Sequence, residues 1–181
     1  MKIRHSLLLL AFSSCAFIGV AAAQTAKPAA QPPAKDTVLK AAEVTPKVLP
    51  ERVFFRGQSA AVQQRNSAGV RYADGFFVLG GLVDNSGYSS SIREKYQAYL
   101  ITEVPLEIGG QTLKPGAYGC GFLEANKFVV MDLGANDVFQ VASAKDAELK
   151  RPVPFQIAEA TGAGNYRLYH GREYIEFHRA K

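Results

Sequence analysis

Three turns within thirty residues constrain the fold of this chain more than any other feature. The stretch from Glu103 to Asp132 reads EVPLEIGGQTLKPGAYGCGFLEANKFVVMD, with strand-like runs between the turns. The pair Gly109-Gly110 suits a two-residue hairpin loop, in which both loop positions can require the positive φ that glycine adopts at little cost. Such a loop places Leu106 opposite Leu113 and Glu107 opposite Thr112.

The other two turns of this stretch carry different signals. Lys114-Pro115-Gly116-Ala117 has proline at the second and glycine at the third position, which favours a type II turn. Glu124-Ala125-Asn126-Lys127 ends the next run, and Asn126 tolerates the left-handed conformation. We therefore expect a β-meander over this stretch.

A further hairpin is indicated at Asp74-Gly75, a strong two-residue turn signal. A two-residue loop there places Tyr72 opposite Phe77 and Val70 opposite Leu79. All four residues would then share one face of the hairpin.

The last hairpin is predicted around Gly171-Arg172, with glycine first as in a type II′ turn. Its register produces one apolar face, and one face with an ion pair and an aromatic pair. The predicted pairs are Leu168 with Ile175, Tyr166 with Phe177, Arg167 with Glu176, and Tyr169 with Tyr174.

These signals together predict an all-β domain over residues 51–181. We expect an antiparallel β-sandwich or barrel of about 8 to 10 short strands. At most one short helix is expected, over Ser143–Lys150, where Asp146 follows Ser143 at capping-box spacing. Residues 58–67 mix strand and helix signals and are interpreted as a strand. Cys120 shares a strand face with Tyr118 and Phe122, which indicates a buried small hydrophobe.

The N-terminus is typical of an export signal. Lys2 and Arg4 precede an apolar run from Ser6 to Val20, and Ala21-Ala22-Ala23 forms an A-x-A cleavage site. We expect residues 1–23 to be a signal peptide cleaved near Ala23, so that the mature protein is periplasmic or secreted and has no transmembrane span. A membrane anchor and lipidation at Cys15 are the alternatives. Residues 24–50, rich in Ala, Pro and Lys, are predicted to be a flexible linker.

Charge argues against a nucleic-acid partner. The whole chain has a formal charge of +5, but from Glu51 onward 15 Lys and Arg stand against 14 Asp and Glu. A nucleic-acid surface needs clustered positive charge on the folded part. We therefore expect no nucleic-acid binding.

The run from Gly109 to Tyr118 reads GG-x-x-L-x-P-G-x-Y. It resembles exported bacterial β domains of unknown function that share a similar hairpin and glycine-turn signature. The resemblance covers roughly 30 residues, mostly turn chemistry. It implies a fold neighbourhood and transfers no catalytic residue.

Few residues offer chemistry. His170 next to Glu173 is a possible acid–base pair at the rim of the fold, but the favoured interpretation is a cross-strand pair that satisfies two polar groups at a loop mouth. The predicted register separates His170 from His178 by about 16 Å, so no metal site is expected. No nucleotide-binding glycine pattern occurs, and no cofactor is expected. A polar loop is the candidate binding surface, with Tyr88, Ser89, Ser90, Tyr96 and Tyr99.

Two minor alternatives concern other loops. Gly87-Tyr88-Ser89-Ser90-Ser91 lacks the final glycine of a serine nucleophile elbow. Asp132, Asn136 and Asp137 supply oxygens around one turn without the spacing of a calcium-binding EF-hand loop.

The sequence therefore predicts an exported domain that binds a ligand or associates with the cell envelope without catalysis. Its partner would be a small polar ligand or an envelope component. A small enzyme using His170 and Glu173, or a subunit that assembles through sheet edges, remains an alternative.

Overall fold

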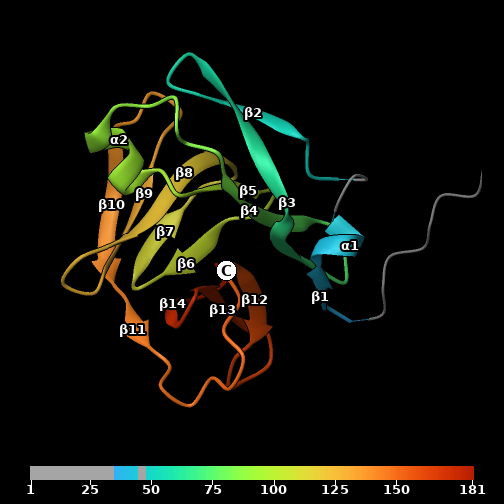
Figure 1. The fold of residues 1–181 in the computed structure, drawn as a ribbon. Coiled ribbons are helices and arrows are strands. Elements are labelled where there is room, and N and C mark those ends of the chain that lie inside the picture. Colours follow the sequence, from blue (N-terminus) through green and yellow to red (C-terminus); the bar gives the residue numbers. More distant parts are fainter. Residues whose placement is uncertain (1–34, 45–47) are drawn as a thin grey trace, which may run out of the picture. The chain divides into compact units, whose positions relative to one another are not determined.

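A computed structural model describes residues 35–44 and 48–181. The predicted signal peptide, the cleavage site near Ala23, the lipidation alternative at Cys15 and the first part of the linker lie outside the described residues. Within the described part, strands form two antiparallel sheets that pack face to face (Figure 1). The prediction of an all-β sandwich is confirmed, and the sheets do not close into a barrel.

The larger sheet has eight strands within the described residues. Seven follow the order β1-β3-β4-β5-β8-β9-β10, and β2 pairs with the first part of β3. A bulge between Val62 and Ser67 separates the two parts of β3. The bounds are β1 Thr37–Lys40, β2 Arg52–Phe55, β3 Gln58–Arg71, β4 Phe77–Val83, β5 Ala98–Thr102, β8 Gly116–Leu123, β9 Lys127–Met131 and β10 Asp137–Ala142.

The smaller sheet has six strands within the same residues. Five follow the order β12-β13-β14-β6-β7, and β11 pairs with the start of β14. The bounds are β6 Leu106–Ile108, β7 Gln111–Leu113, β11 Ala144–Lys145, β12 Gln156–Glu159, β13 Asn165–His170 and β14 Glu173–Arg179.

Two short helices occur in the described part, α1 over Ala41–Val44 and α2 over Ser90–Lys95. Neither has the length and apolar run that a membrane crossing requires. The helix predicted over Ser143–Lys150 is wrong. The chain there forms β11, and the Asp146 N–H donates to the backbone oxygen of Arg172 at 2.9 Å. The backbone N–H and C=O groups that a helix would have paired internally therefore form hydrogen bonds with β14 and the turn before it.

The sheet begins before Glu51. Strand β1 pairs with β3 along its whole length, and Val44 and Leu49 are almost fully buried. Part of the segment predicted to be a linker thus belongs to the sandwich. The few apolar residues of this segment are enough to hold it in place, because they pack against an apolar surface that the larger sheet already provides.

The two glycine hairpins have the predicted registers. Around Gly109-Gly110, Leu106 pairs with Leu113 and Glu107 with Thr112, and both glycines have positive φ. Around Gly171-Arg172, all four predicted pairs occur. Asn126 also adopts the left-handed conformation, with φ 54°.

The register predicted at Asp74-Gly75 is wrong by one residue. Val70 pairs with Val78, and the Tyr72 N–H donates to the Phe76 oxygen at 2.8 Å. The loop therefore holds three residues and ends on Gly75 at φ 92°. A shift of one residue moves alternate side chains to the other face.

The predicted meander over residues 103–132 is also only partly correct. Strands β6 and β7 belong to the smaller sheet, whereas β8 and β9 belong to the larger one. Gly116 has no positive φ, so the expected type II turn is absent. The Lys114-Pro115 segment instead carries the chain from one sheet to the other.

Each face of the larger sheet carries a separate hydrophobic core. The inner core, between the two sheets, comprises Ala68, Val70, Tyr72, Val78, Leu82, Ala98, Leu100, Val104, Leu106, Ile108, Leu113, Cys120, Phe122, Phe128, Val130, Phe155, Ile157, Tyr166, Leu168, Ile175 and Phe177. The outer core, on the opposite face, comprises Val44, Leu49, Val53, Phe55, Ala60, Val62, Leu79, Val83, Tyr88, Ile92, Tyr96, Tyr99, Val129 and Met131.

Candidate functional site

The polar loop predicted to bind a ligand carries its tyrosines inward. Its candidates were Tyr88, Ser89, Ser90, Tyr96 and Tyr99. All three tyrosines belong to the outer core, where Tyr96 is 0% exposed and stacks on Phe55 with ring centroids 3.9 Å apart. The Tyr88 hydroxyl donates to the backbone oxygen of Phe55 at 3.0 Å. Both serines are exposed where α2 begins. The structure thus places core side chains and surface hydroxyls here, on opposite sides of the loop backbone.

His170 and Glu173 are cross-strand neighbours, as predicted. The His170 ring lies against Phe122 with centroids 6.0 Å apart, and burial lowers the histidine pKa although Glu173 opposes this. Glu173 forms an ion pair with Lys145 at 3.3 Å. The cavity that His170 lines has a volume of only about 10 Å³ and is lined largely by apolar residues such as Cys120. This cavity is too small for a substrate, and the His170 side chain is only partly exposed.

Other candidate chemistry is engaged in packing or local turns. No group of three or more His, Cys, Asp or Glu in the described part of the chain is placed to hold a metal ion. Both oxygens of Asp132 accept hydrogen bonds from the Asn136 amide, and one also accepts from the Gly134 N–H. Burial raises the pKa of the Cys120 thiol to about 12, so this cysteine is a poor nucleophile.

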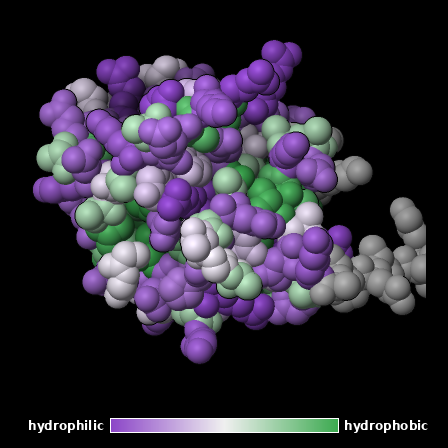
Figure 2. All heavy atoms as spheres, turned by 90° about the horizontal axis from the view of Figure 1, so that it is seen from below, coloured by the Kyte–Doolittle hydropathy of each residue, from purple (hydrophilic) through white to green (hydrophobic). Residues whose placement is uncertain are grey.

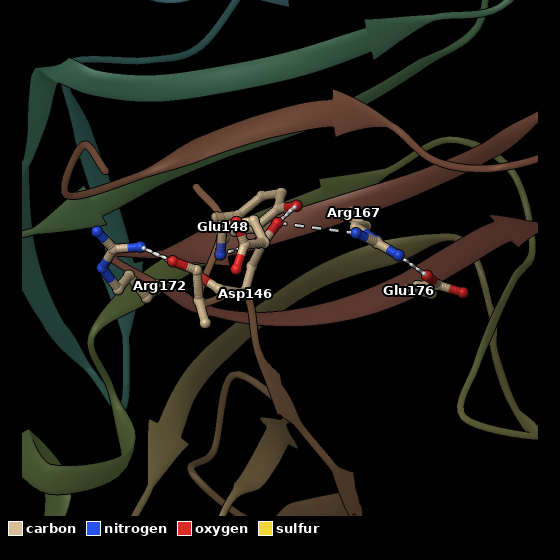
Figure 3. Close-up of polar contacts among 7 residues, drawn as sticks. Asp146, Glu148, Arg167, Arg172 and Glu176 are labelled. Carbon is tan, nitrogen blue, oxygen red and sulfur yellow. Dashed lines mark hydrogen bonds and ion pairs between the residues drawn. The ribbon is translucent and has the colours of Figure 1, made fainter. Parts of the chain in front are cut away.

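A polar cluster covers the outer face of the smaller sheet (Figure 3). Arg167 forms a hydrogen bond with Glu176 at 2.9 Å and lies 3.8 Å from Asp146, and its guanidinium stacks over Tyr174. The Tyr169 hydroxyl donates to the same Asp146 carboxylate at 3.0 Å. The hydrogen-bonding and charged groups of these side chains are paired with one another. The cluster therefore holds the segment around Asp146, which follows β11, to β13.

That side of the domain presents no broad apolar surface. Figure 2 shows the face seen from below in Figure 1, where hydrophilic residues cover most of the surface and apolar residues appear in separate patches. Apolar residues scattered among polar ones in this way are normal for a protein surface.

One hollow that combines space with several polar groups lies where four segments meet, and we call it the end cleft. Another, of about 380 Å³, is lined by residues of β1, β3 and β12, among them Arg65, Asn66 and Gln156. It consists of two adjoining cavities of about 390 Å³ and 310 Å³. Pockets of this size class accommodate small molecules. It is lined by Lys35, Asp36, Tyr72, Ala73, Asp74, Glu159, Ala160, Gly162, Ala163, Gly164, Asn165, Tyr166, His178, Arg179 and Lys181.

Asp36 joins three segments at the end cleft. Its carboxylate accepts a hydrogen bond from the Tyr166 hydroxyl at 2.8 Å and another from the Ala73 N–H at 2.9 Å. Tyr166 lies in the smaller sheet, and Ala73 lies in the loop between β3 and β4. Burial, reinforced by Asp36, raises the pKa of the Tyr166 hydroxyl above its usual range. Both tyrosines at this end therefore meet the cleft as neutral phenols, since burial and Asp36 also raise the pKa of Tyr72 to about 12.

Arg179 is one of three Lys and Arg residues that line the end cleft, with Lys35 and Lys181. Its guanidinium forms an ion pair with Asp74 and lies 5.5 Å from the centre of the Tyr72 ring and 5.9 Å from that of Phe76. The hydrogen bond from Arg179 lowers the pKa of the Asp74 carboxyl. Phe76 is 47% exposed and lies outside the lining of both cavities.

Tyr72 is the unusual group of the end cleft. The residue is 3% exposed, and its hydroxyl has no hydrogen-bond partner among the described residues. A buried hydroxyl without a partner costs about 1–3 kcal/mol relative to a satisfied one. The fold thus retains a polar group at the cleft that nothing in the described protein satisfies.

Sequence reasoning did not find the end cleft. The sequence places Asp36 in the linker and Tyr72 on one face of a hairpin. It suggests His178 only as half of a metal pair that the predicted register rules out. The residues come from four segments far apart in the chain. A weak signal was present in Thr161-Gly162-Ala163-Gly164, whose two glycines adopt positive φ and form one wall.

No family model, curated protein or solved structure matches the chain. Its function must therefore be inferred from the geometry of the described residues.

Proposed function

We propose that this chain is an exported binding module, periplasmic or secreted, that holds a small polar ligand in the end cleft and performs no chemistry on it. One observation carries the proposal: two adjoining cavities of about 390 Å³ and 310 Å³ are lined by charged and hydrogen-bonding side chains from four segments of the chain. Such a cleft offers a small polar ligand several hydrogen-bonding groups at once.

Two contrasts support this choice of site. The cavity beside His170 has about 10 Å³, far less than a substrate requires, and Glu173 is already paired with Lys145. The tyrosines of the polar loop lie in the outer core. The end cleft is better suited to a ligand because it combines volume with charged groups of both signs.

Native mass spectrometry tests the proposal. The exported protein would be purified from its own host at neutral pH, beside the Ala163→Trp variant, which places a large side chain where the two cavities adjoin. We expect a small molecule to remain on the wild-type protein and to be reduced on the variant. Absence of any bound molecule, or equal retention by both proteins, contradicts a ligand site at the end cleft. A stable oligomer without ligand would instead support assembly through sheet edges.

Export is tested separately. Cell fractionation should place the protein outside the cytoplasm, and its N-terminal sequence should begin at Gln24. Protein that keeps residues 1–23, or protein retained in the cytoplasm, contradicts the export part of the proposal. Release from membranes only by detergent, with a lipid on Cys15, would favour the lipoprotein alternative.

A further inference from the structure

We propose that two copies of this chain associate through strand β10, which pairs with itself in antiparallel fashion. The proposal does not depend on a ligand in the end cleft, because β10 and β1 lie at opposite ends of the larger sheet and Asp36 precedes β1. It depends on three properties of β10, namely its unpaired backbone groups, its lack of features that block pairing, and a side-chain pattern that matches itself.

The backbone of β10 has hydrogen-bonding groups that no described strand uses. β10 ends the larger sheet (Figure 1), and among the described strands it pairs only with β9. The Ser143 N–H, just after the end of β10, donates to the Asn126 oxygen at 2.8 Å. Because inward and outward groups alternate along an antiparallel pair, the N–H and C=O groups of Gln140 and Ala142 point away from β9. Both residues are exposed, so a second strand can reach them.

Edge strands are commonly protected by shortness, charge or proline. At the other sheet ends, β7 has only three residues, β1 and β12 have four each, and Pro154 precedes β12. β10 has six residues and no proline, and its single charge, Asp137, is paired with Lys95 at 2.8 Å. Its bulge lies between Asp137 and Phe139, so the strand is regular from Phe139 to Ala142. β10 is thus the least protected sheet end in the described part of the chain.

The side chains of β10 match those of a second β10. In the antiparallel register centred on Gln140, the opposing pairs are Gln140 with Gln140, Val138 with Ala142, and Phe139 with Val141. Phe139 and Val141 are partly buried against the inner core, so pairing extends that core from one copy to the other. Val138, which is 45% exposed in the single chain, gains an apolar neighbour. Apolar residues therefore oppose apolar residues, and no like charges meet.

This geometry also sets the size and the strength of the assembly. A twofold pairing uses the same strand on both copies, so it closes at the dimer. One strand of six residues buries much less area than the roughly 1,600 Å² of a standard stable interface. We therefore expect a weak dimer, with a dissociation constant of about 100 µM.

Sedimentation and amide exchange of the mature protein test the proposal. Between about 50 µM and about 1 mM, the mean mass should rise from near that of the monomer toward that of the dimer. Amide exchange followed by NMR should slow by about threefold over the same range at Gln140 and Ala142, because their N–H groups face solvent only in the monomer. The other amides of the larger sheet should not change.

Charge exchange at the centre of the register supplies the specific test. Gln140→Lys and Gln140→Glu each place like charges opposite each other, so each should weaken the dimer about fivefold. An equal mixture of the two variants brings opposite charges together and should restore association. The Gln140 side chain is exposed and bonds only Asp137 among the described residues, so thermal midpoints should stay close to that of the wild-type protein. Gln111→Lys, on β7, is the matched control and should leave the dimer unchanged within about twofold.

The outcomes are distinct from those for the end cleft. A protein that stays monomeric at about 1 mM, with unchanged exchange at Gln140, overturns the proposal. A dimer that neither Gln140 variant weakens, or that the mixture does not restore, forms through another surface and also overturns it. Neither result affects the test of the end cleft, which measures a retained small molecule.

Discussion

The two cores of this domain lie on opposite faces of one sheet, and they are built differently. The inner core is enclosed by a second sheet, so large side chains from both sides fill it. The outer core is enclosed by the β2–β3 hairpin, α2 and the segment that carries Val44 and Leu49. A hairpin and a short helix offer fewer apolar residues than a sheet, so these elements must approach the larger sheet closely.

Glycines of β8 allow that close approach. A Cβ atom at Gly119 would lie 2.5 Å from the Phe55 ring, and one at Gly121 would overlap the backbone oxygen of Lys95. The inner face of the same strand instead presents Cys120 and Phe122. The outer core thus needs two glycines in β8, and the inner core needs one in β4, since a Cβ at Gly80 would lie 2.8 Å from the Phe155 ring.

The same contrast appears in two tyrosines. Tyr72 and Tyr96 both bury a hydroxyl without a partner among the described residues. Tyr72 borders a cleft, whereas Tyr96 is enclosed between Phe55 and Tyr88. Both hydroxyl oxygens are buried, so the two positions differ in their surroundings rather than in solvent access.

The largest expected effect tests whether both cores are integral. Phe55→Ala in the outer core and Phe128→Ala in the inner core should each lower the free energy of unfolding by about 3–5 kcal/mol, because both rings are fully buried. Urea denaturation measures both losses. If Phe55→Ala lowers the free energy of unfolding by less than about 1 kcal/mol, the outer core contributes little to stability. The two cores would then not be equally integral to the fold.

The next effect tests the close approach at β8. Gly121→Ala should destabilise by about 1–3 kcal/mol, because the Lys95 oxygen belongs to the backbone and cannot turn aside. Gly87→Ala is the control, since its nearest neighbour would be the end of the Gln58 side chain at 3.9 Å. Equal thermal midpoints for the two variants would show that α2 can move away from β8 without loss of stability.

A smaller effect compares the two unsatisfied hydroxyls in the absence of ligand. Tyr72→Phe and Tyr96→Phe should each raise the free energy of unfolding by about 1 kcal/mol, because each removes a buried polar group that lacks a partner. Chemical denaturation of both variants at one pH measures this. If Tyr96→Phe stabilises the protein but Tyr72→Phe destabilises it, then the Tyr72 hydroxyl has a partner in solution. The two tyrosines would then differ in how well their hydroxyls are satisfied.

The smallest effect concerns pH at the edge of the inner core. Burial lowers the pKa of His170, so the unfolded chain binds a proton more readily than the folded protein. This contribution to stability is complete above about pH 6.5, the ordinary histidine value, and is lost as the pH falls toward the folded pKa. Thermal midpoints measured from pH 7.5 to 5 should fall less for His170→Gln than for the wild-type protein. Parallel curves would contradict it.

Turns whose glycines specify the conformation were predicted correctly. At Gly109-Gly110 and at Gly171-Arg172 the loop length sets the register, and one face of each hairpin is clearly more apolar than the other. At Asp74-Gly75 the strand that follows the turn, β4, is apolar on both faces, so the residue pattern does not penalise a shift of one residue. Packing against two cores chose Val78, rather than Leu79, to face inward.

The sequence by itself determined the strand content, the all-β class and two hairpin registers, because these follow from local backbone preferences and from alternation along short runs. Only the tertiary structure decided which sheet each hairpin joins, that β1 belongs to the larger sheet, and that 144–145 is a strand. It alone brought Asp36, Tyr72 and Arg179 together, since their contacts span more than a hundred residues of chain and no local preference encodes them.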